Sequence, residues 1–280
     1  QPSFGIAQKG QKSRVIFSGL PMGHEFTSFI LALLQVSGRP PKVDEDTIER
    51  IKKIDKIINL ETYVSLTCHN CPDVVQAFNI MATLNPNITH TMIEGGMYQD
   101  EVKAKGIMSV PTVYKDQEEF TSGRATIEQL VEKLDGPLDA EAFADKGVYD
   151  VLVIGGGPAG NSAAIYAARK GLKTGLLAET FGGQVIETVG IENMIGTLYT
   201  EGPKLMAQVE EHTKSYDVDI IKSQLATGIE KKELIEVTLA NGAVLKSKTA
   251  ILALGAKWRN INVPGEEEFR NKGVTYCPHC

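Results

Sequence analysis

Cysteine is scarce in this sequence. Among 280 residues there are four cysteines, and all of them belong to two Cys-x-x-Cys pairs. A secreted domain held together by disulfides is much richer in cysteine, whereas two cysteines at this spacing are typical of a redox-active dithiol. The low number therefore excludes a disulfide scaffold and directs attention to redox chemistry.

Excess positive charge and long apolar runs are also absent. The formal net charge is −6, which gives no basic field to hold nucleic acid or anionic lipid. The longest apolar run, Phe29 to Leu34, is about a third of what a membrane-spanning helix requires. The polar first residues lack the pattern of a signal peptide. We therefore expect a cytoplasmic protein with neither nucleic acid nor membrane as a partner.

The composition that is present is that of an ordinary globular protein, with 42% hydrophobic and 23% charged residues. Because single domains run to roughly 100 to 150 residues, the length predicts two or three domains. The sequence begins without methionine and ends on Cys280. We therefore expect it to be part of a longer polypeptide.

The first half has the pattern of a thioredoxin fold. Residues 14–19 form a predicted strand, and apolar residues at helical spacing follow over 26–34. A second predicted helix follows an acidic cluster, and its apolar stripe consists of Ile48, Ile51, Ile54 and Ile58. Strands at 62–67, 88–93 and 110–114 come next, and then a strand and helix over 119–134. This order, with Cys-x-x-Cys after the first of those strands, describes a thioredoxin fold.

The second half has the pattern of a dinucleotide-binding domain. A buried-type strand at 149–154 leads into Gly155–Gly160, which match Gly-x-Gly-x-x-Gly, and a helix follows over 158–170. Such glycines let a pyrophosphate approach the positive end of the helix. Glu179 ends the next strand, where it can accept a hydrogen bond from a ribose hydroxyl. The alternative interpretation of the motif is a tight structural turn.

A hairpin signal, Asn241-Gly242, and a buried-type strand at 250–254 complete this half. They predict a parallel sheet with an antiparallel excursion. The polar, small residues 136–147 between the two halves are interpreted as a linker.

Cys68 and Cys71 lie between a predicted strand and a predicted helix. The positive end of the helix stabilises a thiolate at Cys68 and lowers its pKa, so we expect Cys68 to attack and Cys71, a turn inside the helix, to resolve. A zinc site is the alternative. Cys71 and Cys277 are about 200 residues apart, however, whereas paired zinc motifs are separated by roughly 15 to 20. No metal is therefore expected.

Two residues elsewhere fit the same site. In a thioredoxin context we expect a cis Val110–Pro111 bond beside Cys68, which would leave backbone groups free for a partner peptide. Glu25 lies in the turn before an apolar helix, where a partly buried carboxyl can give or take a proton from the thiols. An interaction of Glu25 with the helix dipole explains its position equally well.

The second pair, Cys277 and Cys280, follows the glycine-motif region, which suggests that a bound flavin reduces it. His69 and His279 lie inside the pairs and can bias thiol pKa values, whereas His24 carries no specific signal.

Together these motifs resemble those of the flavoprotein subunit of alkyl hydroperoxide reductase, a relative of low-molecular-weight thioredoxin reductase. The resemblance covers nearly the whole chain. The resemblance rests on residues 23–28, 65–72, 109–111, 155–160, 182–184 and 275–280. It implies an α/β protein in which thioredoxin-like folds precede a Rossmann-like FAD/NAD-linked reductase domain, here truncated.

The resemblance also implies a division of the chain. Residues 1–43 would be the C-terminal part of a first thioredoxin-like fold and 44–135 a second one. Residues 136–147 would be the linker, 148–270 the first segment of the FAD-binding domain, and 271–280 the start of a nicotinamide domain.

The implied activity is that of an NADH-dependent, FAD-containing disulfide oxidoreductase. Electrons would pass from NADH to FAD, then to Cys277/Cys280, then to Cys68/Cys71, and finally to a peroxiredoxin subunit that reduces alkyl hydroperoxides and hydrogen peroxide. In this family Cys280 would face the flavin and Cys277 would exchange outward. Glu25 matches the family's acid-base residue. We also expect a homodimer.

The flavin site implied by the motif and the resemblance consists of Gly155, Gly157, Pro158, Ala159, Gly160, Glu179, Gly183, Gln184 and Asn193. One position departs from the family, since Leu254 stands where Ala-Thr-Gly has threonine. The family continues past the second pair, so we expect the 280 residues alone to bind FAD weakly or not at all and not to accept hydride from NADH. The alternatives are an NADH oxidase that reduces oxygen through flavin, and a non-catalytic module whose cysteines hold zinc.

Overall fold

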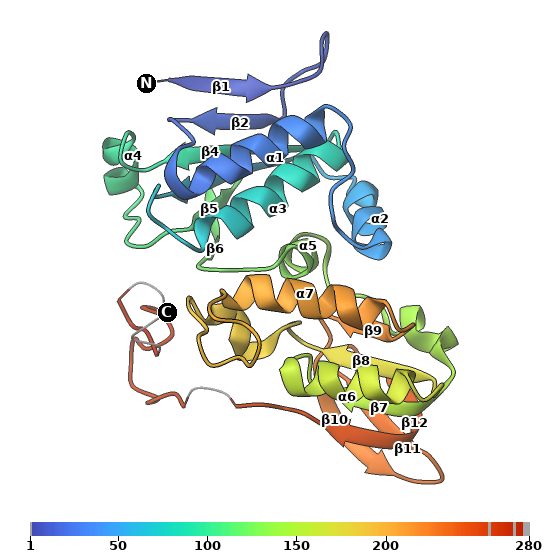
Figure 1. The fold of residues 1–280 in the computed structure, drawn as a ribbon. Coiled ribbons are helices and arrows are strands. Elements are labelled where there is room, and N and C mark those ends of the chain that lie inside the picture. The colour runs from blue at the N-terminus through green and yellow to red at the C-terminus, as the bar shows by residue number, and fades with distance from the viewer. Residues whose placement is uncertain (1, 257–258, 271–272, 277–280) are drawn as a thin grey trace. The chain divides into compact units, whose positions relative to one another are not determined.

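The structure is a computed structural model that describes residues 2–256, 259–270 and 273–276 (Figure 1). It contains two compact units. The first comprises Gln1–Gly136 and Ile261–Thr275, and the second comprises Pro137–Asn260 together with Tyr276. Within the described ranges, none of the helices has the length and apolar character needed to cross a bilayer.

The first unit is built on a six-stranded sheet with the order β1-β2-β4-β3-β5-β6. Its strands are β1 (Ser3–Ile6), β2 (Val15–Ser18), β3 (Ile58–Val64), β4 (Ile88–Glu94), β5 (Thr112–Lys115) and β6 (Glu118–Ser122). Its helices are η1 (Gly23–Glu25), α1 (Phe26–Val36), α2 (Glu45–Lys53), α3 (Cys71–Leu84), α4 (Gln99–Ala104) and α5 (Ile127–Asp135). The succession from β3 to α5 confirms the predicted thioredoxin fold.

Alternate strand residues of this sheet enter two cores, as the two-residue period of a strand requires. Leu60 and Met92 belong to the main core, which α1, α3 and α5 also fill. Figure 1 shows α1 and α3 side by side along the sheet. Tyr63 and Ile93 point the other way, into a smaller cluster with Val102 of α4. The sheet is therefore covered on both faces.

Residues 1–43 join the same sheet as the residues that follow them. β2 pairs in parallel with β4, and β1 pairs with β2 in antiparallel fashion. The segments expected to belong to two thioredoxin-like folds thus share one continuous sheet. The division at 43/44 stays a prediction.

Helix α1 forms where the apolar spacing predicts it, but small residues face the core. Ser28 and Ala32 are fully buried, whereas Phe26, Ile30 and Leu33 are 49%, 38% and 41% exposed. The large apolar residues thus leave much of their surface on the outside of this unit.

The helix predicted from the isoleucine stripe is shorter than expected. Its last predicted member, Ile58, begins β3 instead. The side-chain amide of Asn85 donates hydrogen bonds to the carbonyls of Ile51 and Ile54, at 2.6 and 2.8 Å. These bonds satisfy carbonyls that a helix end leaves without partners, so α2 can stop before the stripe does.

The second unit also has a six-stranded sheet, in the order β10-β11-β12-β7-β8-β9. β12, β7, β8 and β9 are parallel, and the hairpin β10-β11-β12 is antiparallel. The strands are β7 (Val148–Ile154), β8 (Thr174–Ala178), β9 (Asp219–Lys222), β10 (Ala226–Lys231), β11 (Ile235–Leu239) and β12 (Val244–Leu252). The helices are η2 (Ala140–Lys146), α6 (Pro158–Ala168), η3 (Gly183–Glu187) and α7 (Gly202–Lys214). This confirms the predicted parallel sheet with an antiparallel excursion.

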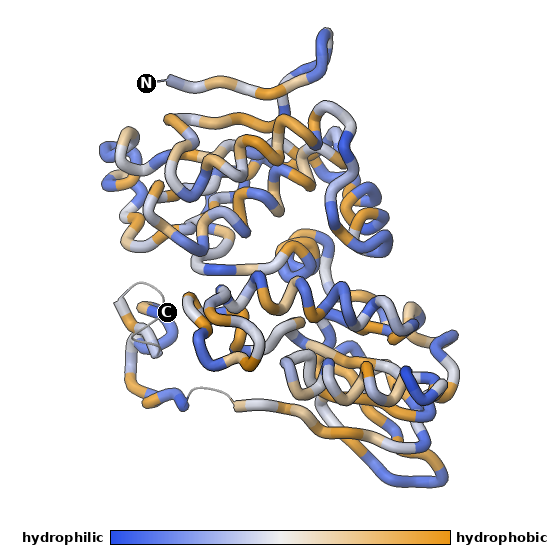
Figure 2. The backbone as a smooth tube through the Cα atoms, in the orientation of Figure 1, coloured by the Kyte–Doolittle hydropathy of each residue, from blue (hydrophilic) through white to orange (hydrophobic). Residues whose placement is uncertain are grey.

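Burial in this sheet is greatest in the central strands. Leu152 of β7 and Leu176 of β8 are fully buried, and Figure 2 shows hydrophobic residues gathered along the sheet. The prediction of a buried strand at 250–254 is wrong in its burial, because Ile251, Leu252 and Leu254 are 39%, 57% and 67% exposed. The chain extends there as expected, but no described element covers these side chains.

The segment interpreted as a linker, residues 136–147, has structure of its own. It contains η2, and Phe143 is only 6% exposed in a cluster with Tyr149, against which Leu138 also packs. The two apolar residues of an otherwise polar segment therefore anchor it to the second unit.

Candidate functional site

The first cysteine pair lies where β3 gives way to α3. Cys68 and Cys71 form a disulfide. Cys71 is fully buried, whereas Cys68 is partly exposed. The helix begins at Cys71, so this residue is not a turn inside it as predicted. The backbone N–H of Cys71 donates to the Sγ of Cys68 at 3.1 Å, which places a donor of the helix start on the accessible sulfur.

The peptide bond between Val110 and Pro111 is cis, as expected. The carbonyl oxygen of Val110 lies 3.7 Å from the Sγ of Cys68. The loop that enters β5 therefore forms one wall beside the exposed sulfur.

The turn at Gly23–Glu25 forms another wall. The N–H of His24 donates to the carbonyl of Leu66 at 3.1 Å. A Cβ at Gly23, whose φ is +56°, would lie 2.4 Å from that same oxygen, so the close approach needs glycine. The ring of His24 lies 4.1 Å from the ring of His69. His24 thus belongs to the site, although no pattern in its sequence neighbourhood predicts this.

Glu25 is fully buried beside this turn. Neither carboxyl oxygen has a hydrogen-bond partner of good geometry among the described residues. Burial raises the pKa of Glu25 to about 7, a weak interaction with the hydroxyl of Ser28 opposes the rise, and the Asp73 carboxylate adds to it. The carboxyl can therefore exchange a proton near neutral pH.

Polar side chains of α3 face this carboxyl. Gln76 donates through Nε2 to the hydroxyl of Ser28 at 3.2 Å. Asp73 forms an ion pair with Arg124 at 2.6 Å. Ser28 and Asp73 thus act on the pKa of Glu25, and Gln76 and Arg124 are their partners.

The glycine loop after β7 shows why each glycine is needed. A Cβ at Gly155 would lie 2.1 Å from the carbonyl oxygen of Ala253, and one at Gly160 would lie 1.8 Å from that of Gly155. A Cβ at Gly157 would meet no atom of this unit closer than 3.9 Å. The first and third glycines are therefore required by the chain's own packing, while the second faces open space.

A second loop, after β8, meets the first. The N–H of Gly182 donates to the carbonyl of Gly156 at 2.9 Å. A Cβ at Gly183 would lie 3.5 Å from the Cα of Gly157. Because carboxyl ends of parallel strands share one edge of a sheet, the two loops form one cradle there.

This cradle fits the pyrophosphate of a dinucleotide. The open side of Gly157 is where a phosphate can approach, and Pro158 and Ala159 start α6, whose N-terminus favours an anion. Glu179 and Gln184 are exposed next to the second loop. Asn193 is exposed between η3 and α7, and no hydrogen bond between it and the glycine loop is found within the described chain.

Comparison with known proteins agrees with the folds of both halves of the chain. The model of the pyridine nucleotide-disulphide oxidoreductase family matches residues 149–280, and that of a thioredoxin domain matches 58–135. The F subunit of alkyl hydroperoxide reductase in Xanthomonas campestris pv. phaseoli is 55% identical over 286 residues, which cover 100% of this chain and 55% of that protein. Over its whole length the chain is thus similar to the F subunit of alkyl hydroperoxide reductase.

Other relatives carry different names. A Bacillus subtilis (strain 168) protein named NADH dehydrogenase is 62% identical over 279 residues, covering 100% of this chain and 55% of that protein. The chain spans about half the length of these curated relatives. A solved structure of the N-terminal domain of alkylhydroperoxide reductase from Enterococcus faecalis (V583) has 34% identity and a TM-score of 0.45, covering 48% of this chain and 64% of that one.

The second predicted dithiol, Cys277 and Cys280, lies outside the described residues. As for metals, the described ranges contain no group of three or more His, Cys, Asp or Glu side chains suited to hold an ion. In the first pair, both sulfurs are engaged in the disulfide.

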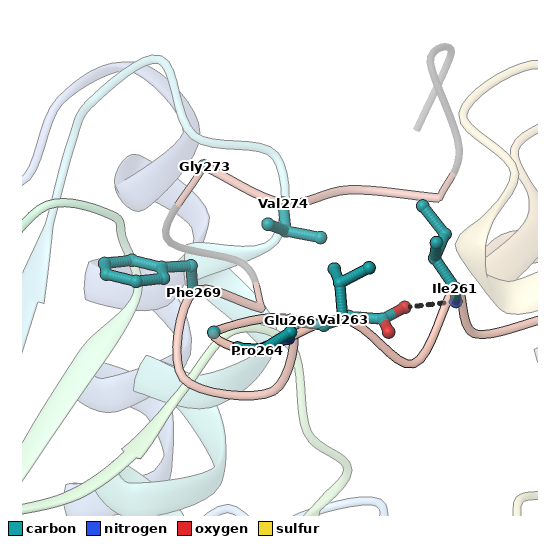
Figure 3. Close-up of a pocket in the computed structure, with 8 residues that line it drawn as sticks. Ile261, Val263, Pro264, Glu266, Phe269, Gly273 and Val274 are labelled. Atoms are coloured by element: carbon teal, nitrogen blue, oxygen red, sulfur yellow. Dashed lines mark hydrogen bonds between the residues drawn. The ribbon is translucent and has the colours of Figure 1, made fainter.

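An apolar pocket of about 330 Å³ lies in the segment 261–274 (Figure 3). Val263, Phe269 and Val274 help to line it, and the Glu266 carboxylate accepts the N–H of Ile261 at 2.8 Å. None of the site residues predicted from the sequence lines this pocket. Its lining includes no residue of the dithiol or of the glycine cradle.

Proposed function

We propose that this chain is the part of an NADH-dependent flavoprotein that delivers electrons through a dithiol to a peroxiredoxin. The observation that carries the proposal is the asymmetry of the first pair, in which a partly exposed Cys68 is bonded to a fully buried Cys71. The dinucleotide cradle in the same chain and the relatives among alkyl hydroperoxide reductases support it.

The exchange at the dithiol follows from that asymmetry. In the reduced state, the Cys68 thiolate attacks a disulfide sulfur of the partner, and a partner thiolate leaves as the mixed disulfide forms. The Cys71 thiolate then attacks the Sγ of Cys68, which restores the internal disulfide and releases the second partner thiolate. Two electrons pass to the partner, whose two thiolates take up two protons, one released by Cys71 and one from solvent. Glu25 is the group proposed to take the proton from Cys71.

A flavin, when bound, supplies a carrier that accepts hydride from NADH and passes two electrons to a disulfide. The residues proposed to hold its pyrophosphate are Gly155, Gly157, Pro158, Ala159, Gly160 and Gly183, with Glu179 toward a ribose and Gln184 and Asn193 toward the rest of the cofactor. The identity of FAD and NADH, the relay through Cys277/Cys280 and the homodimer stay part of the proposal.

The test is peroxide-dependent oxidation of NADH by the full-length protein mixed with a peroxiredoxin. We expect Cys68→Ser to abolish this turnover while the flavin absorbance stays unchanged. Cys71→Ser should instead accumulate a mixed disulfide with the peroxiredoxin, visible on a non-reducing gel, because nothing resolves it. Ser37→Ala, at the surface end of α1, is the matched control and should behave as wild type. If Cys68→Ser oxidised NADH as fast as wild type in this assay, the proposal would be wrong.

Reduction of oxygen by the flavin is the competing activity, and the name of the Bacillus subtilis relative fits NADH oxidation with either acceptor. Oxygen uptake with NADH in the absence of peroxiredoxin separates the two. Uptake that is fast, and equally fast in Cys68→Ser, would favour an NADH oxidase.

A further inference from the structure

Asn161 ties the glycine loop to α6. This residue lies in the first turn of the helix and is fully buried. Its Nδ2 donates to the carbonyl oxygen of Gly156 at 2.7 Å and to that of Gly157 at 3.0 Å. One side-chain amide therefore satisfies carbonyls of two consecutive residues of the loop.

These bonds set the direction of a peptide unit. The carbonyl of Gly156 accepts a second hydrogen bond from the N–H of Gly182, so two donors hold it toward the protein. Because the peptide unit is planar and trans, the N–H of Gly157 points the opposite way. No hydrogen bond from that N–H is found among the described residues, and a Cβ at Gly157 would also meet no atom closer than 3.9 Å. The loop thus presents a donor to the space that a phosphate would occupy.

Thr213 of α7 supports Asn161 from behind. Its hydroxyl lies 2.8 Å from the Oδ1 of Asn161 and 2.8 Å from the carbonyl of Val209, and Thr213 is fully buried. The two glycine carbonyls can only accept hydrogen bonds, which assigns the NH₂ of the amide to the loop and its oxygen to Thr213. A hydrogen-bonded line therefore runs from α7 through Asn161 to the loop.

We propose that Asn161, oriented by Thr213, is a positioning residue that sets the affinity of the loop for a dinucleotide pyrophosphate by turning the N–H of Gly157 outward. The inference rests on the flavin binding of the proposed function. It differs from the glycine motif itself, since any residue can occupy the position after Gly160 without breaking Gly-x-Gly-x-x-Gly. A purely structural role, in which Asn161 only secures the start of α6, is the competing explanation.

The experiment titrates FAD into full-length protein freed of flavin and follows the quenching of flavin fluorescence. We expect Asn161→Ala to raise the Kd about tenfold, the effect of losing net hydrogen bonds of ordinary strength. Thr213→Val, which keeps the shape and removes the hydroxyl, should raise it about threefold. Ser162→Ala changes an exposed neighbour on the same helix and should bind as wild type.

Asn161→Asp separates positioning from structure. An ionised carboxylate cannot donate to the loop, whereas a protonated one can donate to the Gly156 carbonyl. The affinity of this variant for FAD, relative to wild type, should therefore recover as the pH is lowered, and that of Asn161→Ala should not. The thermal midpoint of the flavin-free protein, measured in parallel, shows at which pH values the variant is folded, and affinities are compared only at those values.

Wild-type affinity for FAD in Asn161→Ala would overturn the inference. A loss of affinity in Asn161→Asp that does not change with pH would overturn it as well. If the wild-type protein itself bound no FAD, the proposed function would fall and the inference with it. The two failures are therefore distinct.

Discussion

Glu25 couples the stability of the first unit to pH. Its pKa is raised from 4.5 to about 7, mainly by burial, so the folded state holds a proton that the unfolded chain has lost between these values. The stabilisation is therefore full below pH 4.5 and is lost as the pH rises through about 7. We expect Glu25→Gln to match wild type in acid and to exceed it above neutrality by on the order of 3 kcal/mol.

Urea unfolding of both proteins across this pH range measures the effect, with hydrogen exchange of α3 assigning the transition to the first unit. Glu49→Gln is the matched control, because Glu49 is exposed and its ion pair is with Lys52 on the same helix. A difference between Glu25→Gln and wild type that does not change with pH would contradict the expectation.

The ion pair of Asp73 and Arg124 gives a second prediction for Glu25. Since the Asp73 carboxylate raises the pKa of Glu25, Asp73→Asn should lower this pKa. Arg124→Met should raise it, because Arg124 lies 2.6 Å from Asp73 and offsets its charge. Titration of the Glu25 carboxyl carbon by NMR measures both shifts. Their opposite signs are the signature, and shifts of the same sign would argue against this arrangement.

For single residues, the sequence predicted the functional side chains best where their chemistry depends on near neighbours in the chain. Cys68 and Cys71 share one turn, and the three glycines of the motif share one loop, so spacing alone was enough to find them. His24 and Asn161 could not be found in this way. His24 meets His69 only because the turn packs on Leu66, and Asn161 is hydrogen-bonded by Thr213 of another helix.

Among the elements, β4 carries a polar network that should make the first unit sensitive to acid. The ring of His90 is fully buried, with Nε2 2.8 Å from the Thr62 hydroxyl and Nδ1 2.8 Å from Oδ1 of Asn79. Burial lowers the pKa of His90 from 6.5 to about 3. Between these two values the unfolded chain binds a proton that the folded state does not bind. Stability is therefore lost as the pH falls from 6.5 toward 3.

Thr62→Val tests this network at neutral pH. The substitution leaves the Nε2 of His90 buried without its partner, so we expect a loss of about 1 to 3 kcal/mol in the free energy of unfolding. Urea unfolding gives the value. Thr91→Val, on β4 itself, is the control, because Thr91 makes no side-chain hydrogen bond among those of the described residues. Equal effects of the two substitutions would show that the hydrogen bond to His90 contributes nothing.

Elements with a strong local pattern were predicted closely, and those fixed by distant contacts were not. β4, β7 and the start of α6 lie where their apolar runs and proline indicate. The end of α2 depends on Asn85, which lies beyond the next strand and helix, and no pattern near Ile54 announces it. The helix α7 and the strands β9 and β10 were not predicted, because the two strands are short and more than half of the residues of α7 are polar.

For the whole molecule, the two units have separate cores. Val74, Phe78 and Met92 belong to the core of the first, and Leu152 and Ile154 to a core of the second. The length predicts two or three domains, and the chain forms two compact units, with the apolar residues of the predicted linker packed within the second.

Separate cores predict separate unfolding transitions that respond to different ligands. FAD, if bound by the cradle, stabilises only the state in which the second unit is folded, by about 2.7 kcal/mol at a hundredfold excess over Kd. Reduction of the disulfide between Cys68 and Cys71 acts on the first unit alone. In calorimetry of the full-length protein we therefore expect FAD to raise one transition and a dithiol reductant to move another. Asn161→Ala should weaken only the response to FAD. A single transition that both reagents shift together would mean that the two units unfold as one.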